Sequence, residues 1–492
     1  MDMSLISRLF SFHWGSVFRN PNKIQEKVLL DILFNNTTSA YGQRFGFGDI
    51  KSVQDFQASL PIVDYSLITS YIERIKNGEQ NVLTTDSVIY FATTSGTTNK
   101  PKFIPVTERR VSDFMFENIL WVLLALKYNK KFFGGKMLYF AGAKSEGKTT
   151  GGVPFGSISG FIANRQKERF AKRIAVGEEV FDCKSFNEKM KTYYKQSLPQ
   201  DVRQISFAYP TELLLFVKYI AERKNSEINL SELWPNLSLV GCFKKALDDY
   251  PIQQIIGLDT LVIDHGIRAS EGTISIGCNP SGRSGIPAIQ QTFLEFREVN
   301  TENTPIFVHQ LKEGIFYEVI MTTPYGLYRY SIGDIIQVSG WVKNLPLIEF
   351  VSRNKTLDTV GEHVPYSQIE SAVRDAESKS GIELIDYTLI PNKENVKPTY
   401  DLFVEIKKGD NESLQRFLSF FEKFLQEKVL SYERMRNYFN RLGEPRLLTV
   451  KKGEYNELNK RRIMGESQPK SKHVAEDSKF QRQLSVEQII TL

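Results

Sequence analysis

Hydroxyl side chains gather around a single glycine early in the chain, directly after a short apolar stretch. The segment 92–102 reads Ala-Thr-Thr-Ser-Gly-Thr-Thr-Asn-Lys-Pro-Lys, and residues 87–91 before it have the composition of a buried strand. Hydroxyls and backbone N–H groups can surround a polyphosphate, a lysine adds positive charge, and a glycine lets the backbone approach closely. These residue types predict a phosphate-binding loop, although hydroxyls alone also suit a polar surface loop.

The order of the residues in this segment is more specific than their types. The string T-S-G-T-T-x-x-P-K resembles the phosphate loop of the adenylate-forming enzymes, the superfamily of luciferase and the acyl-CoA synthetases. Asn99 stands where that superfamily usually has glycine, and asparagine is the next most tolerant residue at positive φ. The resemblance implies that the protein uses ATP, that Lys102 is a catalytic residue, and that the nucleotide is bound by Thr94, Ser95, Gly96, Thr97 and Thr98.

Three segments ahead of this loop point to one family within the superfamily. Residues 41–47, 56–63 and 71–78 read as a loop, a turn into an extended piece and a helix with a charged face. As an ordered series they resemble the auxin-responsive acyl-acid amido synthetases of plants and their bacterial relatives, the Gretchen Hagen family. That family also has a lysine and an Ile-Pro pair after its phosphate loop, matched here by Lys102, Ile104 and Pro105.

A second glycine-rich segment imitates a nucleotide-binding motif. Residues 142–149 satisfy G-x-x-x-x-G-K-[ST], the Walker pattern, and the apolar residues 137–140 precede them as a strand should. A Walker loop needs a helix that opens at its lysine, so that N-terminal amides face the phosphate. Residues 150–156 read Thr-Gly-Gly-Val-Pro-Phe-Gly, which cannot propagate a helix. We therefore expect a mobile loop at the rim of the acyl pocket instead.

The tetrapeptide Ala269-Ser270-Glu271-Gly272 follows the strand-like residues 261–264. Four such residues alone suit an ordinary turn. After a buried strand, and downstream of a phosphate loop, they resemble the family's A-[ST]-E-G segment. The resemblance implies that Ala269 and Ser270 contact the nucleotide and that Glu271 is catalytic and helps to hold Mg²⁺ on the phosphates. Mg²⁺ takes one or two carboxylates together with phosphate oxygens, so a single glutamate is sufficient.

Residues 322–334 contain the string Gly-Leu-Tyr-Arg-Tyr-x-x-Gly-Asp. A hairpin with an aromatic cross-strand face is the simpler interpretation. A tight turn that presents one carboxylate would also suit ribose, because a carboxylate can accept hydrogen bonds from both hydroxyls. The string closely resembles the family's own and implies that Tyr330 and Asp334 bind the nucleotide. Arg353 matches a second family position near the ribose, and a plain surface arginine is the alternative there.

The tail of the chain holds one more candidate. Residues 468–472, Gln-Pro-Lys-Ser-Lys, resemble the family's Q-x-K-x-P, in which the lysine reaches the active site when the small domain closes. Lys470 is therefore a candidate catalytic residue. Lys472 replaces the expected proline and is the second candidate, and a solvated lysine remains the alternative.

The elements that must position these residues are read from the apolar patterns. An amphipathic helix is expected over residues 21–35, with Asn22 as its N-cap. Residues 201–300 alternate strands, at 237–243 and 261–264, with a helix over 211–220. These patterns and the resemblance predict an α/β fold, in which a large N-terminal adenylate-forming domain of layered sheets and helices is joined to a smaller α+β C-terminal domain.

The domain boundary is expected just after Arg353, which gives a large ATP- and acyl-binding domain at 1–355 and a mobile C-terminal domain at 356–492. Asp358 lies where the superfamily often keeps a hinge residue. The small domain should contain a helix from residue 367, strands at 385–390 and 400–406, and an amphipathic helix whose apolar stripe spans 414–429. Residues 466–483 are polar and charged and predict a solvated or mobile tail.

Composition bounds the class of protein. A chain of 492 residues exceeds what one core usually organises, and 41% hydrophobic with 24% charged residues is typical of a globular protein. The formal net charge of +6 is small for this length and its charges are interspersed, which argues against a nucleic-acid-binding surface. We expect small-molecule partners and a monomer.

Cysteines, histidines and the N-terminus indicate the compartment. Three scattered cysteines fit buried free thiols in a reducing environment, and the five histidines lack metal-ligand spacing. No secretory signal is evident in residues 1–18, and the longest apolar run, 119–126, is too short to span a bilayer and reads as a core helix. We expect a cytosolic protein without membrane association; delivery by a route that leaves no classical signal stays open.

The resemblance implies that the protein is an ATP-dependent ligase. Such an enzyme adenylates a small carboxylic acid with the help of Mg²⁺, and an amino acid's amine then attacks the acyl carbon to give an amide and AMP. An acceptor such as coenzyme A or a protein is the alternative within enzymes. A nucleotide-binding protein without turnover is the alternative from another class, since fold resemblance alone does not guarantee chemistry.

Overall fold

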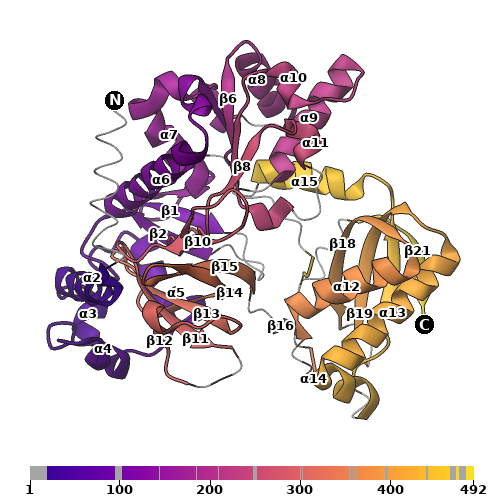
Figure 1. Ribbon diagram of the computed structural model, residues 1–492. Coiled ribbons are helices and arrows are strands. Elements are labelled where there is room, and N and C mark those ends of the chain that lie inside the picture. The colour runs from indigo at the N-terminus through magenta and orange to yellow at the C-terminus, as the bar shows by residue number, and fades with distance from the viewer. Residues whose placement is uncertain are drawn as a thin grey trace. The chain divides into compact units, whose positions relative to one another are not determined.

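The computed structural model describes residues 19–94, 102–142, 144–183, 186–208, 210–247, 252–299, 301, 303–353, 356–357, 359–360, 362, 364–393, 397–438, 441–465, 473–475 and 484–492 (Figure 1). The chain divides into two compact units. Of the described residues, 19–94, 102–351 and 463–465 belong to the large unit, and the remainder belong to the small unit. No helix among these residues has the length and apolar content that crossing a membrane requires.

Three sheets organise the large unit. The first has the strand order β2-β1-β5-β4, the second has the order β12-β11-β13-β14-β15-β10-β9, and the third has the order β3-β6-β7-β8. The strands are β1 (Val88–Thr94), β2 (Lys102–Thr107), β3 (Lys136–Tyr139), β4 (Gly147–Lys148), β5 (Pro154–Gly156), β6 (Val202–Ser206), β7 (Leu239–Cys242), β8 (Leu261–Asp264), β9 (Ser275–Gly277), β10 (Gly285–Pro287), β11 (Phe293–Glu298), β12 (Ile306–Phe307), β13 (Phe316–Thr322), β14 (Tyr330–Val342) and β15 (Leu345–Arg353).

Helices lie among these sheets and fill two apolar cores. The third sheet is parallel, because helices connect its successive strands, as the alternating pattern predicts. The predicted α/β class is confirmed. The helices of the large unit are α2 (Pro21–Asn35), α3 (Ala40–Arg44), α4 (Val53–Ser59), α5 (Tyr65–Lys76), α6 (Glu108–Tyr128), α7 (Ile158–Phe170), α8 (Phe186–Ser197), α9 (Pro210–Lys224), α10 (Leu230–Leu233) and α11 (Ile252–Ile256).

Side-chain caps fix where two of these helices begin. Asp64 Oδ1 accepts hydrogen bonds from the backbone N–H groups of Ser66 at 2.9 Å and Leu67 at 3.3 Å, which starts α5 at Tyr65. Thr107 Oγ1 accepts from the N–H of Arg110 at 3.3 Å, so α6 begins immediately after β2 ends. The predicted cap of α2 is wrong: Asn20 rather than Asn22 is the N-cap, because Pro21 is preorganised for the first helical position.

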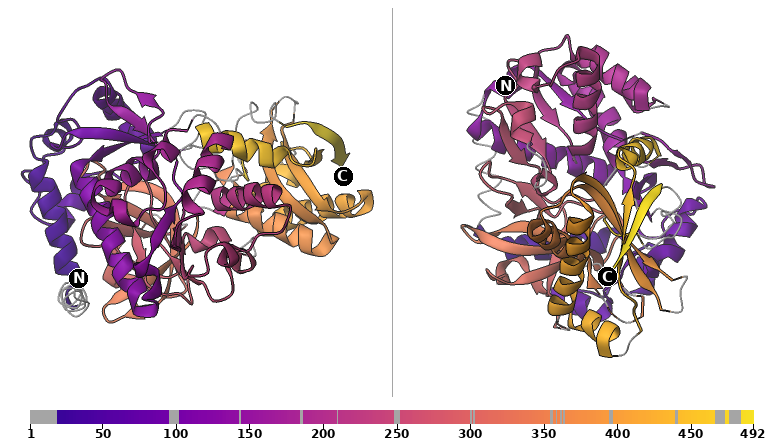
Figure 2. Two further views of the ribbon diagram at one scale, coloured as in Figure 1. Left: turned by 90° about the horizontal axis from the view of Figure 1, so that it is seen from above. Right: turned by 90° about the vertical axis from the view of Figure 1, so that its right-hand side faces the viewer.

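Helices cover the four-stranded sheet of the small unit, drawn from orange to yellow in Figure 2. Leu402 and Val404 pack with α12 and α13 in one core, while Phe403 between them packs with Tyr455 in another, as strand alternation requires. The predicted apolar stripe of α13 is core. The elements are β16 (Thr356–Leu357), β17 (Val364–Pro365), β18 (Glu383–Asn392), β19 (Thr399–Lys408), β20 (Arg446–Val450), β21 (Val486–Thr491), α12 (Tyr366–Ser380), α13 (Asn411–Lys428), α14 (Leu430–Glu433) and α15 (Glu454–Gly465).

Part of the segment predicted as a solvated tail is bound to this sheet. Residues 473–475 lie beside β18, where Leu389 donates to the carbonyl of His473 at 2.8 Å and Ala475 donates to the carbonyl of Leu389 at 3.0 Å. Val474 is buried. The prediction is wrong for these residues, because polar composition does not reveal that a sheet edge can pair with their backbone.

A buried ion pair joins three segments of the large unit. The guanidinium of Arg329 donates to both carboxylate oxygens of Glu295, at 3.1 and 3.0 Å, and both side chains are buried. Its Nη1 also donates to the carbonyls of Gln57 at 3.0 Å and Leu60 at 2.7 Å. The arginine of the predicted ribose string therefore holds the start of β14 against β11 and the end of α4.

Substitution of Arg329 by methionine should destabilise the protein strongly. The change leaves the buried Glu295 carboxylate without its partner, which costs about 3–5 kcal/mol. Urea-induced unfolding should shift to lower denaturant concentration by a corresponding amount. The control is Lys27→Met, which breaks an exposed pair with Asp31 and should change stability by less than about 0.5 kcal/mol. Equal effects of the two variants would contradict a structural role for the Arg329 pair.

Candidate functional site

The predicted phosphate loop joins two neighbouring strands. Thr94 at the end of β1 is paired with Lys102 at the start of β2, and the two strands are antiparallel. The predicted residues Ser95, Gly96, Thr97 and Thr98 lie outside the described residues, as do Lys470 and Lys472. For Thr94 and Arg353 the backbone is described and the side chain is not. The roles predicted for all of these residues stay predictions.

Lys102 lies against a tyrosine that the sequence analysis did not single out. Its Nζ is 5.4 Å from the ring centre of Tyr65, and the phenol oxygen of Tyr65 accepts the N–H of Phe103 at 2.8 Å. Burial raises the pKa of Asp64, but hydrogen bonds from Ser66 and Leu67 and the charge of Lys102 outweigh it and hold that pKa below its ordinary value. Lys102 forms no ion pair with the described residues.

Glu271 acts electrostatically on the same tyrosine. Burial raises the pKa of Tyr65, and the carboxylates of Glu73 and Glu271 raise it further. Of the two catalytic candidates, Lys102 therefore contacts the ring of Tyr65, and Glu271 acts on Tyr65 through its charge.

The segment Ala269–Gly272 is a tight turn. Arg268 and Thr273 pair across it in an antiparallel bridge, and the backbones of Ala269 and Gly272 exchange hydrogen bonds of 2.9 and 3.2 Å. The turn packs closely at Gly272, where a Cβ would lie 2.9 Å from Met321 Cε and 3.1 Å from the phenol oxygen of Tyr325. The turn therefore packs directly against the segment that carries the predicted ribose-binding string.

Helix α6 holds the turn from another side. Nη2 of Arg110 donates to the carbonyl of Ala269 at 3.3 Å, and Nη1 lies 3.5 Å from Glu117 Oε2. The hydroxyl of Thr273 donates to the same carboxylate at 2.5 Å. Arg110, Glu117 and Thr273 are buried, so charged and polar groups of α6 fix both ends of the turn inside the protein.

Glu271 is available to a cation. Its side chain is buried, yet it forms no hydrogen bond or ion pair with the residues that the structure describes. No group of three or more His, Cys, Asp or Glu side chains that could hold a metal occurs among those residues. A lone carboxylate fits Mg²⁺ only if phosphate oxygens supply further ligands. Glu271 would therefore hold Mg²⁺ only together with the phosphate oxygens of a nucleotide.

Tyr330 and Asp334 are both buried on β14. Tyr330 begins the strand opposite Met321 and belongs to the main core. The expectation of a tight turn at Gly333–Asp334 is wrong. The two residues lie inside β14, where its pairing with β13 is irregular: residues 332–334 of β14 stand opposite the single residue Val319 of β13. Gly333 has φ of 77° at this position. A β-bulge changes the direction of a side chain without ending the strand, so the carboxylate of Asp334 is carried by a strand and not by a loop.

Comparison with known proteins assigns the chain to a family. Models of the GH3 family match residues 15–229 with the N-terminal domain, 285–353 with the central domain and 367–479 with the C-terminal domain. The chain belongs to the GH3 family. The resemblance inferred from the motifs is confirmed.

Individual relatives of this GH3 protein are distant in sequence. Indole-3-acetic acid-amido synthetase GH3.3 of Arabidopsis thaliana is 24% identical over 519 residues, with 89% of this chain and 86% of the relative covered. The structure of GH3.15 acyl acid amido synthetase superposes with a TM-score of 0.84 at 20% identity and covers 97% of this chain and 96% of its own. A 2-hydroxyisobutyryl-CoA ligase superposes at 0.55 and 13% identity, with 93% and 90% covered. The fold is that of adenylate-forming enzymes.

The Walker-like segment forms a hairpin in the GH3 chain. Its lysine, Lys148, lies in β4, which pairs with β5, and no helix opens there, as predicted. Strand β5 lies parallel to β1, with Phe155 opposite Phe91. The hydroxyl of Thr93 donates to Glu146 Oε2 at 3.2 Å. The segment therefore lies beside the strand that enters the predicted phosphate loop.

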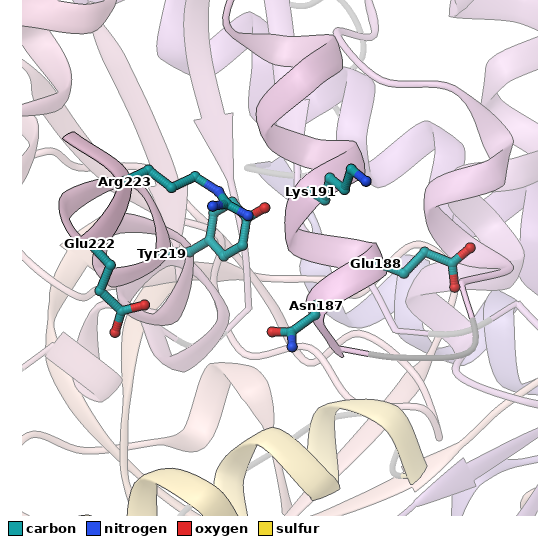
Figure 3. A pocket seen from close by; sticks show the side chains of 6 residues that line it. All are labelled: Asn187, Glu188, Lys191, Tyr219, Glu222 and Arg223. Carbon is teal, nitrogen blue, oxygen red and sulfur yellow. The ribbon is translucent and has the colours of Figure 1, made fainter.

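A surface pocket of about 530 Å³ lies between α8 and α9 (Figure 3). Arg223 stacks on the ring of Tyr219 with its Cζ 4.2 Å from the ring centre. The residues that line the pocket are mixed in charge and include none of the predicted site residues. We therefore do not place the catalytic site in this pocket. The lining residues are Asn187, Glu188, Lys191, Tyr219, Glu222 and Arg223.

Sequence reasoning missed the residues that hold the site together. Tyr65, Arg110 and Arg268 carry no motif, and a charged residue in the first turn of a helix is ordinarily solvated. Asp113, one turn after Arg110, is also buried, and its Oδ2 has no hydrogen-bond partner in the part of the chain that the structure describes. Burial raises the pKa of Asp113 to about 6, Arg109 opposes this shift and Glu117 adds to it.

The pKa of Asp113 predicts a pH dependence of stability. Because the folded-state pKa of about 6 exceeds the ordinary value of 3.8 for an aspartate, the folded protein favours the neutral carboxyl, and stability is lost as pH rises from about 4 to above 6. The Asp113→Asn variant keeps the neutral form at every pH. It should be more stable than the wild type at pH 8 by on the order of 2 to 3 kcal/mol.

Thermal unfolding at pH 8 and pH 4 measures this difference. The difference in unfolding temperature between Asp113→Asn and the wild type should disappear at pH 4. Asp31→Asn, on the exposed face of α2, serves as the control and should show no such gap. A gap of the same size at both pH values would contradict the raised pKa of Asp113.

Proposed function

We propose that the protein is an ATP-dependent acyl-acid amido synthetase. It adenylates a small carboxylic acid and transfers the acyl group to the amine of an amino acid, with release of AMP and pyrophosphate. The observation that carries the proposal is that Lys102, at the end of the predicted phosphate loop, contacts the ring of Tyr65, while Glu271 is buried without a partner among the described residues and its charge acts on the same tyrosine. Membership of the GH3 family supports the same chemistry.

Carboxylate activation explains why these residue types are needed. A carboxylate resists nucleophiles because it is anionic and lacks a good leaving group, whereas an acyl-adenylate loses AMP easily. Lys102 and the hydroxyls of the phosphate loop would offset negative charge while pyrophosphate forms. Glu271 would hold Mg²⁺, which neutralises phosphate charge when bound. Ala269 and Ser270 would position the nucleotide on the rigid turn.

The remaining predicted residues complete the proposal. Tyr330, Asp334 and Arg353 would bind the nucleoside, with the carboxylate of Asp334 accepting from the ribose hydroxyls. Lys470 would enter the site when the small domain rotates between the two steps, with Lys472 as the second candidate. The domains at 1–355 and 356–492 would then be the two moving parts.

We further propose that this enzyme acts as a cytosolic monomer on small molecules. Cys183, Cys242 and Cys278 are all free thiols, which is typical of a reducing compartment. The small, interspersed net charge of +6 supports small-molecule partners over nucleic acid.

Exchange of labelled pyrophosphate into ATP tests the adenylation step. A panel of carboxylic acids should contain at least one that stimulates exchange, and Glu271→Gln should reduce that exchange by about 100-fold or more. Raised Mg²⁺ concentration should restore part of it. Glu26→Gln, on an exposed position of α2, is the matched control and should leave exchange unchanged.

Either of two outcomes would contradict the proposed function. Tight binding of ATP without acid-dependent exchange would indicate a protein that binds nucleotide without turning it over. Full exchange by Glu271→Gln would remove Glu271 from the mechanism. Once exchange is found, a screen of amino acids, coenzyme A and other acceptors for AMP release identifies the second substrate.

A further inference from the structure

Arg268 directly precedes the turn that carries Ser270 and Glu271. Its Nε donates to the carbonyl of His265 at 3.0 Å, and its Nη1 donates to Asn118 Oδ1 at 2.5 Å. Its Nη2 is buried and has no hydrogen-bond partner among the described residues. A guanidinium carries five N–H donors, so these two bonds leave three of them unused. The two bonds fix the plane of the guanidinium and leave one of its edges without a partner.

No carboxylate of the described residues neutralises this arginine. Glu117 is occupied by Arg110 and Thr273, and Asp264 accepts from the N–H groups of Gly266 at 2.6 Å and Lys244 at 2.9 Å. Burial lowers the pKa of Arg268, Glu117 opposes this effect, and Arg110 lowers the pKa further. Both guanidinium carbons lie near the ring of Phe114, that of Arg110 at 5.5 Å and that of Arg268 at 5.6 Å from its centre.

Such an arrangement is costly unless an anion completes it. A buried cation without a partner loses its hydration, and an unused buried N–H group adds a further penalty. A protein can keep such an unpaired buried cation when a bound ligand supplies the missing anion and hydrogen-bond acceptor. The fork of a guanidinium matches the paired oxygens of a carboxylate or of a phosphate.

The side chains around Arg268 remain open to a ligand. Phe114 and Asn118 on α6, Tyr139 at the end of β3, and Ser270 in the turn are all half-buried, and so is Arg268 itself. They contrast with Arg110, which is fully buried behind them. Nη2 of Arg268 itself is buried next to the turn, while Arg268 as a whole and these neighbours are half-buried.

The position of Arg268 limits the size of the ligand. The acid must present its reacting carboxylate to the α-phosphate beside Ser270 and Glu271. Arg268 is three residues from Glu271, which is at most about 11 Å of extended chain and less across a tight turn. The two residues are therefore close enough along the chain for one small acid to contact both.

We propose that Arg268, oriented by Asn118 and the carbonyl of His265, binds a second carboxylate on the acid that the enzyme activates. The substrate is then a small dicarboxylic acid, one carboxylate of which is adenylated while the other is held by Arg268. This inference rests on the proposed function and adds the substrate class to it. Arg268 acts as a specificity-determining residue and takes no part in the bond changes.

Matched pairs of acids test the proposal in pyrophosphate exchange. Benzoate is compared with benzene-1,3-dicarboxylate, and butyrate with glutarate. The wild type should prefer each dicarboxylate at least tenfold in kcat/KM. Arg268→Met should bring the dicarboxylate-to-monocarboxylate ratio of kcat/KM down to about one, through a raised KM for the dicarboxylate. Arg268→Lys should recover part of the preference, because a lysine retains the charge but not the fork.

Two controls keep the test decisive. Arg223→Met removes an arginine from the surface pocket between α8 and α9 and should leave the preference intact. If Arg268→Met does not fold, Asn118→Ala takes its place, since it removes only the hydrogen bond that orients the guanidinium and should also reduce the preference. Thermal unfolding of each variant establishes that it is folded.

Calorimetric titration of benzene-1,3-dicarboxylate without ATP separates this inference from the proposed function. Binding that is lost in Arg268→Met, without exchange for any acid, would uphold the carboxylate site and overturn the proposed function. Exchange with monocarboxylates at least as fast as with dicarboxylates, and an unchanged ratio in Arg268→Met, would overturn the inference and leave the proposed function standing.

Discussion

The contact of Arg110 with the carbonyl of Ala269 couples the two halves of the candidate site. Arg110 lies in the first turn of α6, which begins where β2 ends, and β2 begins with Lys102. The same guanidinium is paired with Glu117, which in turn accepts from Thr273 at the far end of the turn. Because these groups are buried, any displacement of α6 would leave charges unpaired. Lys102 and Glu271 are therefore held in one rigid framework.

Other parts of the large unit depend on the same arrangement. Because residue 272 is glycine, the side chains of Met321 and Tyr325 can pack closely against the turn, and a larger residue there would displace them. Arg329, a few residues later, holds the start of β14 through Glu295, so the strand that carries Asp334 is fixed as well. The site is thus assembled from segments far apart in sequence, each fixed by a buried polar contact rather than by apolar packing alone.

Local sequence patterns predicted the helices, strands and motifs, but contacts between residues distant in sequence determine strand irregularities, the pairing of the tail and the burial of charged side chains. The sequence placed α9, α13, β7 and β8 within a few residues, because periodicity and caps are local properties. It also predicted Glu271 as a site residue and rejected the Walker-like segment. It could not reveal the bulge at Asp334, which depends on pairing with β13, or the attachment of residues 473–475 to β18. Arg268 was equally hidden, because only the fold shows that its guanidinium lacks a carboxylate.

Transfer of an oxygen isotope tests the central claim, which is activation of a carboxylic acid as its acyl-adenylate. The acid that best supports pyrophosphate exchange is labelled with ¹⁸O in its carboxylate and incubated with ATP, Mg²⁺ and the acceptor amine. Attack on the α-phosphate followed by attack of the amine on the acyl carbon leaves one ¹⁸O atom in AMP, which mass spectrometry detects. Unlabelled AMP, or label in orthophosphate with formation of ADP, would contradict the account.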